Sequence, residues 1–146
     1  MSMTMNEIYE EILKDGGMTP SKKIKDTSIR FPNKIAMRYK EFGVWKETTY
    51  KDFWKKSNYL SMGLKFFGIQ KGDSVAIHSE NRPEWFIADI GIQSIGAVSV
   101  GLYPTNPSSE VEYLLSHSES KILFAEDQEQ VDKALEVIDQ LPKLEK

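Results

Sequence analysis

The sequence contains no cysteine among its 146 residues. A disulfide framework, a thiolate zinc site, an iron–sulfur cluster and a cysteine nucleophile are therefore excluded. No apolar run approaches the roughly 18 residues that cross a bilayer, and Met1–Asn6 has neither the basic patch nor the apolar run of a signal peptide. A net charge of −3 excludes an overall basic field, so no nucleic-acid partner is expected. We expect a cytoplasmic globular protein.

The phosphate-binding signatures GxxxxGK[ST] and GxGxxG are also missing. Gly91, Gly96 and Gly101 recur every five residues, a spacing that indicates close packing of the backbone rather than a phosphate site. Ser99 is preceded by a glycine one residue too far away for a GxSxG nucleophile elbow. The short motifs therefore give no catalytic residue.

The two histidines, His78 and His117, lack the HExxH spacing of a metal site. We expect His78 on a strand near a sheet edge and His117 in the last turn of a helix, where its charge suits the helix dipole. A late group of acidic residues is interpreted as a solvated helix face and not as a metal site. Its members are Glu126, Asp127, Glu129, Asp132, Glu136 and Asp139.

What the sequence does contain is 40% apolar residues, enough for a core, in a pattern that alternates short strands with helices. Two runs around Lys40–Gly43 predict a β-hairpin within Lys34–Thr49. Three β–α repeats follow, which predict an α/β fold with a mostly parallel sheet of short strands flanked by helices. The strands are expected at Ser74–Ser79, Val98–Leu102 and Lys121–Ala125, and the helices at Tyr50–Phe67, Glu84–Ala97, Ser109–His117 and Asp127–Leu141.

Smaller signals refine these elements. Thr49 followed by Asp52 predicts a helix cap, and Gly68 the residue just past that helix. Four residues are expected to pack on the sheet, and Val131, Leu135 and Ile138 share a helical spacing. The four are Trp85, Phe86, Ile90 and Ile95.

The N-terminal part is expected to be separate, with a helix and basic connector over 1–30 and a partial α/β domain over 31–146. The helix is placed at Met5–Lys14, and Pro20–Arg30 is interpreted as an exposed connector. Basic residues outnumber acidic ones between Lys22 and Lys40. A basic surface of this kind could contact anionic lipid head groups weakly, so the protein could sit peripherally on a membrane.

Several segments, in one order and spacing, resemble the N-terminal part of AMP-forming acyl-CoA synthetases, of the adenylate-forming superfamily. The pairing of NRPEW with LYPT looks most like the long-chain fatty acid branch. The resemblance runs from Phe31 to Ala125, with glycine at position 101 where proline is common in the family. The segments are Thr48–Phe53, Gly63–Ile77, Asn81–Trp85, Gly96–Val98 and Leu102–Thr105.

The resemblance implies that a full-length enzyme uses ATP and Mg²⁺ to turn a fatty acid into an acyl-adenylate, then transfers the acyl group to coenzyme A. The family's phosphate loop, which ends in Pro-Lys-Gly, and its catalytic lysine come later in the chain, and neither is present before Lys146. This chain is therefore expected to be an inactive fragment that binds none of these cofactors. The missing remainder of the chain is its expected partner.

No catalytic residue and no metal ligand is carried over from the family. Tyr103, Pro104 and Thr105 follow the carboxyl end of a predicted strand, where ligands of open α/β sheets bind, and are the one candidate for a substrate-proximal role.

Two other hypotheses remain open at this point. The chain could be a stand-alone interaction or membrane-surface docking module that uses a free sheet edge or the basic connector, or a nucleotide-binding regulatory domain. Exposed strand edges and apolar patches predict self-association whether the chain is a ligase fragment or a stand-alone interaction module.

Overall fold

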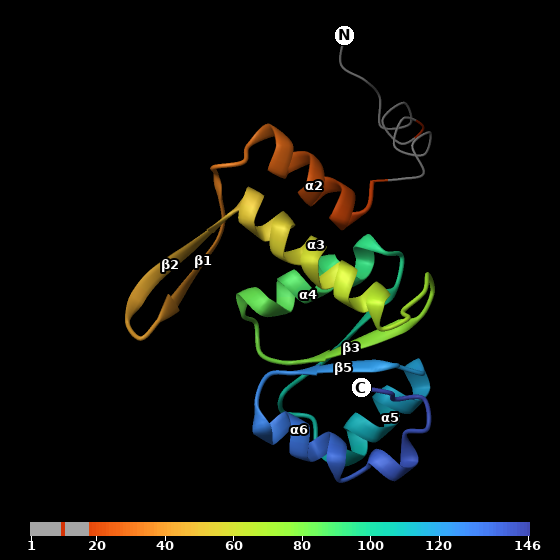
Figure 1. Cartoon of the computed structure of the whole chain (residues 1–146). Helices are drawn as coiled ribbons and strands as arrows, with labels where there is room; N and C mark the ends of the chain where they lie inside the picture. The colour runs from red at the N-terminus through yellow and green to blue at the C-terminus, as the bar shows by residue number, and fades with distance from the viewer. Residues whose placement is uncertain (1–9, 11–17) are drawn as a thin grey trace.

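A computed structural model describes Glu10 and residues 18–146. Its elements stack in layers, with α2 at one end, then α3 and α4, then a parallel sheet, and α5 and α6 at the other end (Figure 1). The helix expected at Met5–Lys14 lies outside the described residues, apart from Glu10. The elements are α2 (Pro20–Arg30), β1 (Ile35–Glu41), β2 (Val44–Thr49), α3 (Tyr50–Phe66), β3 (Ser74–His78), α4 (Pro83–Ser94), β4 (Val98–Leu102), α5 (Ser108–Ser118), β5 (Ile122–Ala125), α6 (Gln128–Leu135) and a 3-10 turn, η1 (Ile138–Gln140).

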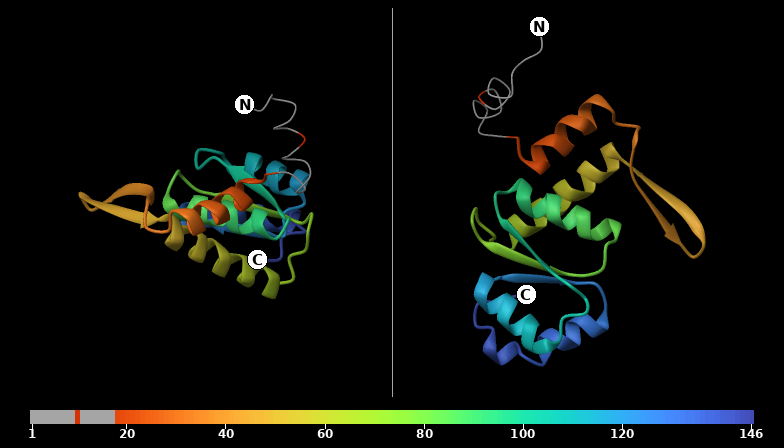
Figure 2. Two further views of the ribbon diagram at one scale, coloured as in Figure 1. Left: turned by 90° about the horizontal axis from the view of Figure 1, so that it is seen from above. Right: turned by 180° about the vertical axis from the view of Figure 1, so that it is seen from behind.

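The parallel sheet has the strand order β4-β3-β5 and is accompanied by a separate antiparallel hairpin of β1 and β2. The connection through α4 covers one face of the sheet, and α5 and α6 cover the other (Figure 2). This arrangement confirms the predicted α/β class. Among the described helices, none has the length and apolar character that crossing a bilayer requires.

The central strand β3 divides the core because its side chains alternate between the two faces. Val75 and Ile77 pack with Leu64 and Ile92 on the α3–α4 side. Ala76 packs with residues of α5 and the C-terminal segment on the other side. A strand buried on both faces reads as a continuous apolar run, which is why this strand could be recognised in the sequence.

The two helices on the first face approach closely at Gly91. A Cβ atom added there would lie 2.9 Å from the carbonyl oxygen of Ser57 and 2.7 Å from a methyl carbon of Leu60. The hydroxyl of Ser61 strengthens the contact by donating to the carbonyls of Ser57 and Gly91, at 2.9 Å each. The predicted close approach of the backbone is therefore confirmed at Gly91.

The predicted helix cap and hairpin turn are both present. The Thr49 hydroxyl accepts from the Asp52 N–H at 3.1 Å at the start of α3, and Gly68 follows the helix with φ +87°. In the hairpin turn, Phe42 and Gly43 both have positive φ (46° and 80°), as a two-residue turn between right-twisted strands requires.

The prediction that Pro20–Arg30 is an exposed connector is wrong, because this segment is the helix α2. Thr19 caps it, Pro20 occupies its first turn and Arg30 pairs with Asp26 one turn earlier. The helix packs against α3 and α4 with the small side chains of Ser21 and Ser28 buried. Because the buried residues of α2 are serines, its sequence lacks the apolar periodicity by which a packed helix is recognised. The division of the chain at residue 30 stays a prediction.

Two further expectations about packing are corrected. Phe86 is 44% exposed and does not pack on the sheet, whereas Ile90 is buried, and Trp85 and Ile95 pack at the edge of the core. The C-terminal helix ends at Leu135 and not at Leu141, and the exposed residues Val131 and Leu135 of the helix are followed by exposed Ile138 in η1. The side that faces the core carries Gln130, Ala134, Val137 and Leu141 instead.

The outer edge of β5 is not bare. The Leu123 N–H donates to the carbonyl of Lys146 at 2.9 Å, and the Glu145 N–H donates to the carbonyl of Lys121 at 2.8 Å. The last residues therefore run along this edge and cover part of it.

Candidate functional site

The carboxyl ends of the three parallel strands bring three short loops together. The chain leaves β3 toward the α3–α4 face and leaves β4 toward the α5–α6 face. Ligands of open α/β sheets bind at such a reversal. A cavity of about 310 Å³ lies there, lined by Ser79, Asn81, Trp85, Gly101, Leu102 and Tyr103.

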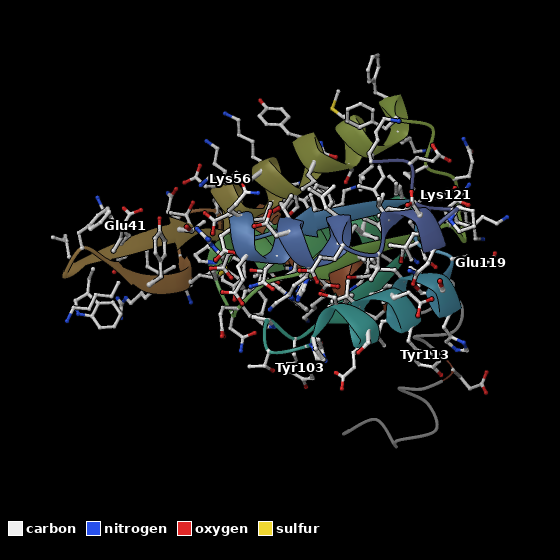
Figure 3. The ribbon with its side chains drawn as sticks, turned by 90° about the horizontal axis from the view of Figure 1, so that it is seen from below. Glu41, Lys56, Tyr103, Tyr113, Glu119 and Lys121 are labelled. Carbon is white, nitrogen blue, oxygen red and sulfur yellow. The ribbon has the colours of Figure 1, made fainter. Side chains whose placement is uncertain are left out.

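In the loop after β4 the backbone of Tyr103 is held by hydrogen bonds, whereas its side chain is exposed to solvent. The Tyr103 N–H donates to the side-chain oxygen of Asn106 at 2.7 Å, and its carbonyl accepts from the Asn106 N–H at 2.9 Å. The phenol ring is 78% exposed and lies at the rim of the molecule beside the start of α5 (Figure 3). Pro104 and Thr105 form the turn between Tyr103 and Asn106.

Two side chains, one from β3 and one from α6, hold the loop after β4 in place. His78 Nε2 lies 3.1 Å from the Tyr103 carbonyl and donates to it, and Lys133 Nζ donates to the Pro104 carbonyl at 2.6 Å. Lys133 also donates to Gln130 at 3.1 Å and pairs with Glu129 at 2.8 Å. The loop that carries the candidate residues is therefore anchored from β3 and from α6.

His78 does not lie near a sheet edge, as the sequence suggested, but at the end of the central strand and fully buried. Burial lowers the pKa of His78 below its usual value, and nearby Lys133 acts in the same direction. With Nε2 donating to Tyr103, Nδ1 is an unprotonated acceptor, and it has no hydrogen-bond partner in the structure. His117 lies, as predicted, in the last turn of α5, stacked on Tyr113.

The loop after β3 is tied to β5 by an ionic cluster. Arg82 pairs with Glu84 at 2.9 Å and with Glu126 at 3.1 Å. Glu126 also accepts from the Glu80 N–H at 2.7 Å and from the Ser79 hydroxyl at 3.1 Å. A second cavity, of about 260 Å³, lies beside this cluster over an apolar floor that includes Leu60, Trp85 and Phe124.

Arg82 and Glu84 favour each other's charged forms. The hydrogen bond to Glu84 raises the pKa of Arg82 above its usual value. Burial by itself would raise the pKa of Glu84, but its own backbone N–H and the Arg82 guanidinium hold that pKa below its usual range. One cation is thus shared by two carboxylates.

The residues of the Arg82 cluster do not fit a nucleoside triphosphate or Mg²⁺. Arg82 is already taken up by Glu84 and Glu126, so the cluster would repel phosphate rather than neutralise it. Within residues 18–146 and Glu10, no group of three histidine or acidic side chains is placed to hold a metal ion.

Sequence reasoning missed Arg82, Glu126 and Lys133. Glu126 was grouped with the solvated acidic face, but it precedes α6 and its side chain is only 21% exposed. Arg82 and Glu126 could have been identified as site candidates, because each follows closely after an apolar strand in the sequence. Lys133 left no comparable signal, because its partners are one backbone carbonyl group and two neighbours on its own helix. A substrate-proximal role for Tyr103, Pro104 and Thr105 stays a prediction.

Comparison with known proteins places these features in context. The sequence model described as "AMP-binding enzyme" matches residues 24–146. A long-chain-fatty-acid–CoA ligase of Xenopus laevis, ACSBG2, is 32% identical over 120 residues, which are 82% of this chain and 16% of that protein. The long-chain-fatty-acid–CoA ligase FadD15 of Mycobacterium bovis is 35% identical over 102 residues, 70% of this chain and 17% of that protein. The chain thus spans about a sixth of the length of these relatives.

Solved structures show the same fold. The anthranilate CoA ligase AuaEII, in complex with anthranoyl-AMP, superposes with a TM-score of 0.78 at 24% identity over 86% of this chain and 23% of that chain. The N-terminal subdomain of Klebsiella oxytoca NpsA superposes with a TM-score of 0.67 at 27% identity over 75% of this chain and 28% of that chain.

Proposed function

This chain belongs to the AMP-binding enzyme family, and on that premise we propose that it forms part of a ligase that joins a long-chain fatty acid to coenzyme A. The whole protein would use ATP to make an acyl-adenylate and pyrophosphate, and coenzyme A would then displace AMP. The observation that carries the proposal is the unbroken family match over residues 24–146, which includes the whole parallel sheet. The likeness to two long-chain-fatty-acid ligases supports the choice of substrate.

We further propose that this chain alone has no ligase activity. Its own residues do not fit ATP or Mg²⁺, because the one arginine at the strand ends is shared between two carboxylates. Acyl activation requires the charge on the phosphates to be stabilised and the carboxylate to be positioned. What this chain supplies is support: the Arg82–Glu126 pair and the Lys133–Pro104 bond hold the loops at the strand ends in fixed positions.

The test compares the 146-residue chain with the product of the whole reading frame that encodes it. Pyrophosphate release from ATP is measured with palmitate, acetate and anthranilate, each with and without coenzyme A. We expect turnover only from the longer product, and fastest with palmitate. Turnover by the 146-residue chain alone would contradict its inactivity. A reading frame that ends at Lys146 would favour the docking-module hypothesis instead.

The role of Tyr103 is tested in the longer product. Its backbone makes the hydrogen bonds of the loop, and its ring is exposed. Tyr103→Ala therefore removes the ring and leaves the loop in place. A substrate-proximal ring predicts a raised KM for the fatty acid with an unchanged denaturation midpoint. An unchanged KM would mean that Tyr103 does not contact the substrate. The matched control is Tyr113→Ala, on the surface of α5.

A further inference from the structure

Charge is strongly divided along the chain. Residues 20–66, which form α2, the hairpin and α3, contain twelve lysines and arginines and four acidic residues, a net charge of +8. Residues 67–146 contain six basic and fourteen acidic residues, a net charge of −8. The overall charge of −3 conceals this division. Figure 1 shows α2 and α3 toward one end of the molecule and α5 and α6 at the other, so the basic residues gather toward one end and the acidic residues toward the other.

Helix α3 has two faces that are not alike but are both partly apolar. Phe53, Ser57, Ser61 and Leu64 are buried against the rest of the fold. The opposite face carries Lys51, Lys55, Tyr59, Met62 and Phe66 at spacings of four, four, three and four residues, which places them in one line. We call this line the α3 ridge. Each of its members is exposed, Phe66 by 85%.

The α3 ridge is an outermost feature of the molecule. Figures 2 and 3 show α3 along one side of the body, with Lys56 labelled on it and no other element beyond it. Lys55 Nζ lies 5.7 Å from the centre of the Tyr59 ring, so cation and aromatic ring share the same surface. A helix with an apolar stripe on its solvent side, in addition to its packed side, has a surface that needs a partner.

We propose that the α3 ridge docks on an anionic lipid bilayer, with α3 lying in the plane of the interface. Met62 and Phe66 enter the boundary between head groups and acyl chains, Tyr59 lies at the head-group level, and Lys51 and Lys55 contact lipid phosphates. Amphipathic helices with lysine and aromatic residues bind in this way. The lysines of α3 itself supply the positive charge that faces the bilayer.

Two observations favour a bilayer over other partners. A nucleic acid or another polyanion would use the lysines but would gain nothing from exposed Met62 and Phe66. A protein partner would need a groove shaped to this convex row of side chains, whereas a fluid bilayer adapts to it. This inference stands independently of the proposed ligase activity, because it rests on the exposed side chains of α3 and not on the residues at the strand ends.

The test is co-sedimentation of the chain with vesicles of phosphatidylcholine alone and with added phosphatidylglycerol. We expect binding to the anionic vesicles that weakens with salt and little binding to the neutral ones. Lys51→Gln with Lys55→Gln should lower the partition coefficient roughly thirtyfold. Met62→Gln with Phe66→Gln should lower it at least about tenfold. Glutamine keeps helix propensity, and circular dichroism checks the fold of each variant.

The hairpin tip provides the matched control, because Phe42 and Trp45 are also exposed. Phe42→Asn suits the positive φ of that position and removes an exposed aromatic ring away from the ridge. It should leave the partition coefficient within about twofold.

Several results would overturn the proposal. Loss of binding in Phe42→Asn but not in the ridge variants would move the contact to the hairpin. Equal binding to heparin, unaffected by Met62→Gln with Phe66→Gln, would make the partner a polyanion. A ridge-dependent dimer in sedimentation, without vesicle binding, would make it a second copy. Failure of the longer reading-frame product to bind vesicles would mean that other parts of the protein cover the ridge.

Discussion

The two faces of the parallel sheet are built for different tasks. On the α3–α4 face, Ile77, Ile92 and Leu64 form an apolar layer, and the helices are close enough to exclude a side chain at Gly91. On the α5–α6 face, the apolar layer gives way near the carboxyl end of the sheet to buried His78 and Gln130. The first face holds the fold together, whereas the second also fixes the loop that begins at Tyr103.

The difference originates in β3 itself. Val75 and Ile77 point to the first face, and Ala76 and His78 to the second. A polar residue at the end of an otherwise apolar buried strand has to find a partner, and here that partner is the backbone of the next strand's loop. A strand-end histidine of this type is therefore a positioning group rather than a surface residue.

The largest effect is expected from a cavity in the first face. Ile92→Ala should lower the free energy of unfolding by about 3–4 kcal/mol, since Ile92 is fully buried. Trp85→Ala, in the same helix, should cost only about half as much, because Trp85 packs at the edge of this core and is partly exposed. Urea denaturation of both variants measures the difference. A larger loss from Trp85 would show that the core is centred nearer the strand ends.

The next effect tests the close approach of α3 and α4. Gly91→Ala should destabilise by about 1–3 kcal/mol, because the new methyl group would meet the Ser57 carbonyl at 2.9 Å. Gly63→Ala is the matched control, also in a helix but with nothing within 4 Å of the added Cβ. It should stabilise by up to about 1 kcal/mol through helix propensity. Equal effects of the two substitutions in urea denaturation would contradict a tight contact at Gly91.

A smaller effect is expected on the second face. Lys133→Met should cost about 1 kcal/mol, because it removes the bond to the Pro104 carbonyl and the pair with Glu129. The more specific result is local. Hydrogen exchange at the Asn106 N–H, which donates to Tyr103, should become faster, while exchange in β3 changes only as much as the global stability. Lys143→Met, at an exposed position outside this network, should leave the Asn106 exchange rate unchanged.

The elements predicted correctly from the sequence are those with strong local signals. Val75–Ile77 is an uninterrupted apolar run, Thr49 a cap and Gly68 a stop, so β3 and α3 were placed to within about one residue. The helix α2 was missed because it packs through Ser21 and Ser28. The buried residues of α6 are Gln130 and Ala134, which are not members of the apolar series Val131, Leu135 and Ile138. Small and polar contact residues escape a hydrophobic pattern.

The candidate site was predictable only in outline. The loop from Tyr103 follows directly from its place after a strand, but the strand order β4-β3-β5 does not follow from the order along the chain. That order puts His78 at the centre of the sheet and not at its edge, and puts the Arg82 loop beside Glu126, 44 residues away in sequence. Contacts between distant segments set the site, and no local pattern encodes them.

The smallest expected effect is a pH dependence due to His78. Its pKa is lowered in the folded protein, chiefly by burial and also by Lys133, while the hydrogen bond to the Tyr103 carbonyl and the carboxylates of Asp127 and Glu129 act in the opposite direction. The unfolded chain, with a histidine pKa of about 6.5, therefore binds a proton first as the pH falls. Stability should be level above that value and decline below it, until the folded form also takes up the proton.

His78→Gln, which keeps a donor for the Tyr103 carbonyl, should remove this decline in denaturation midpoints measured across that range. His117→Gln, on the exposed end of α5, should leave it in place, and the reverse result would show that the second face does not depend on a neutral His78.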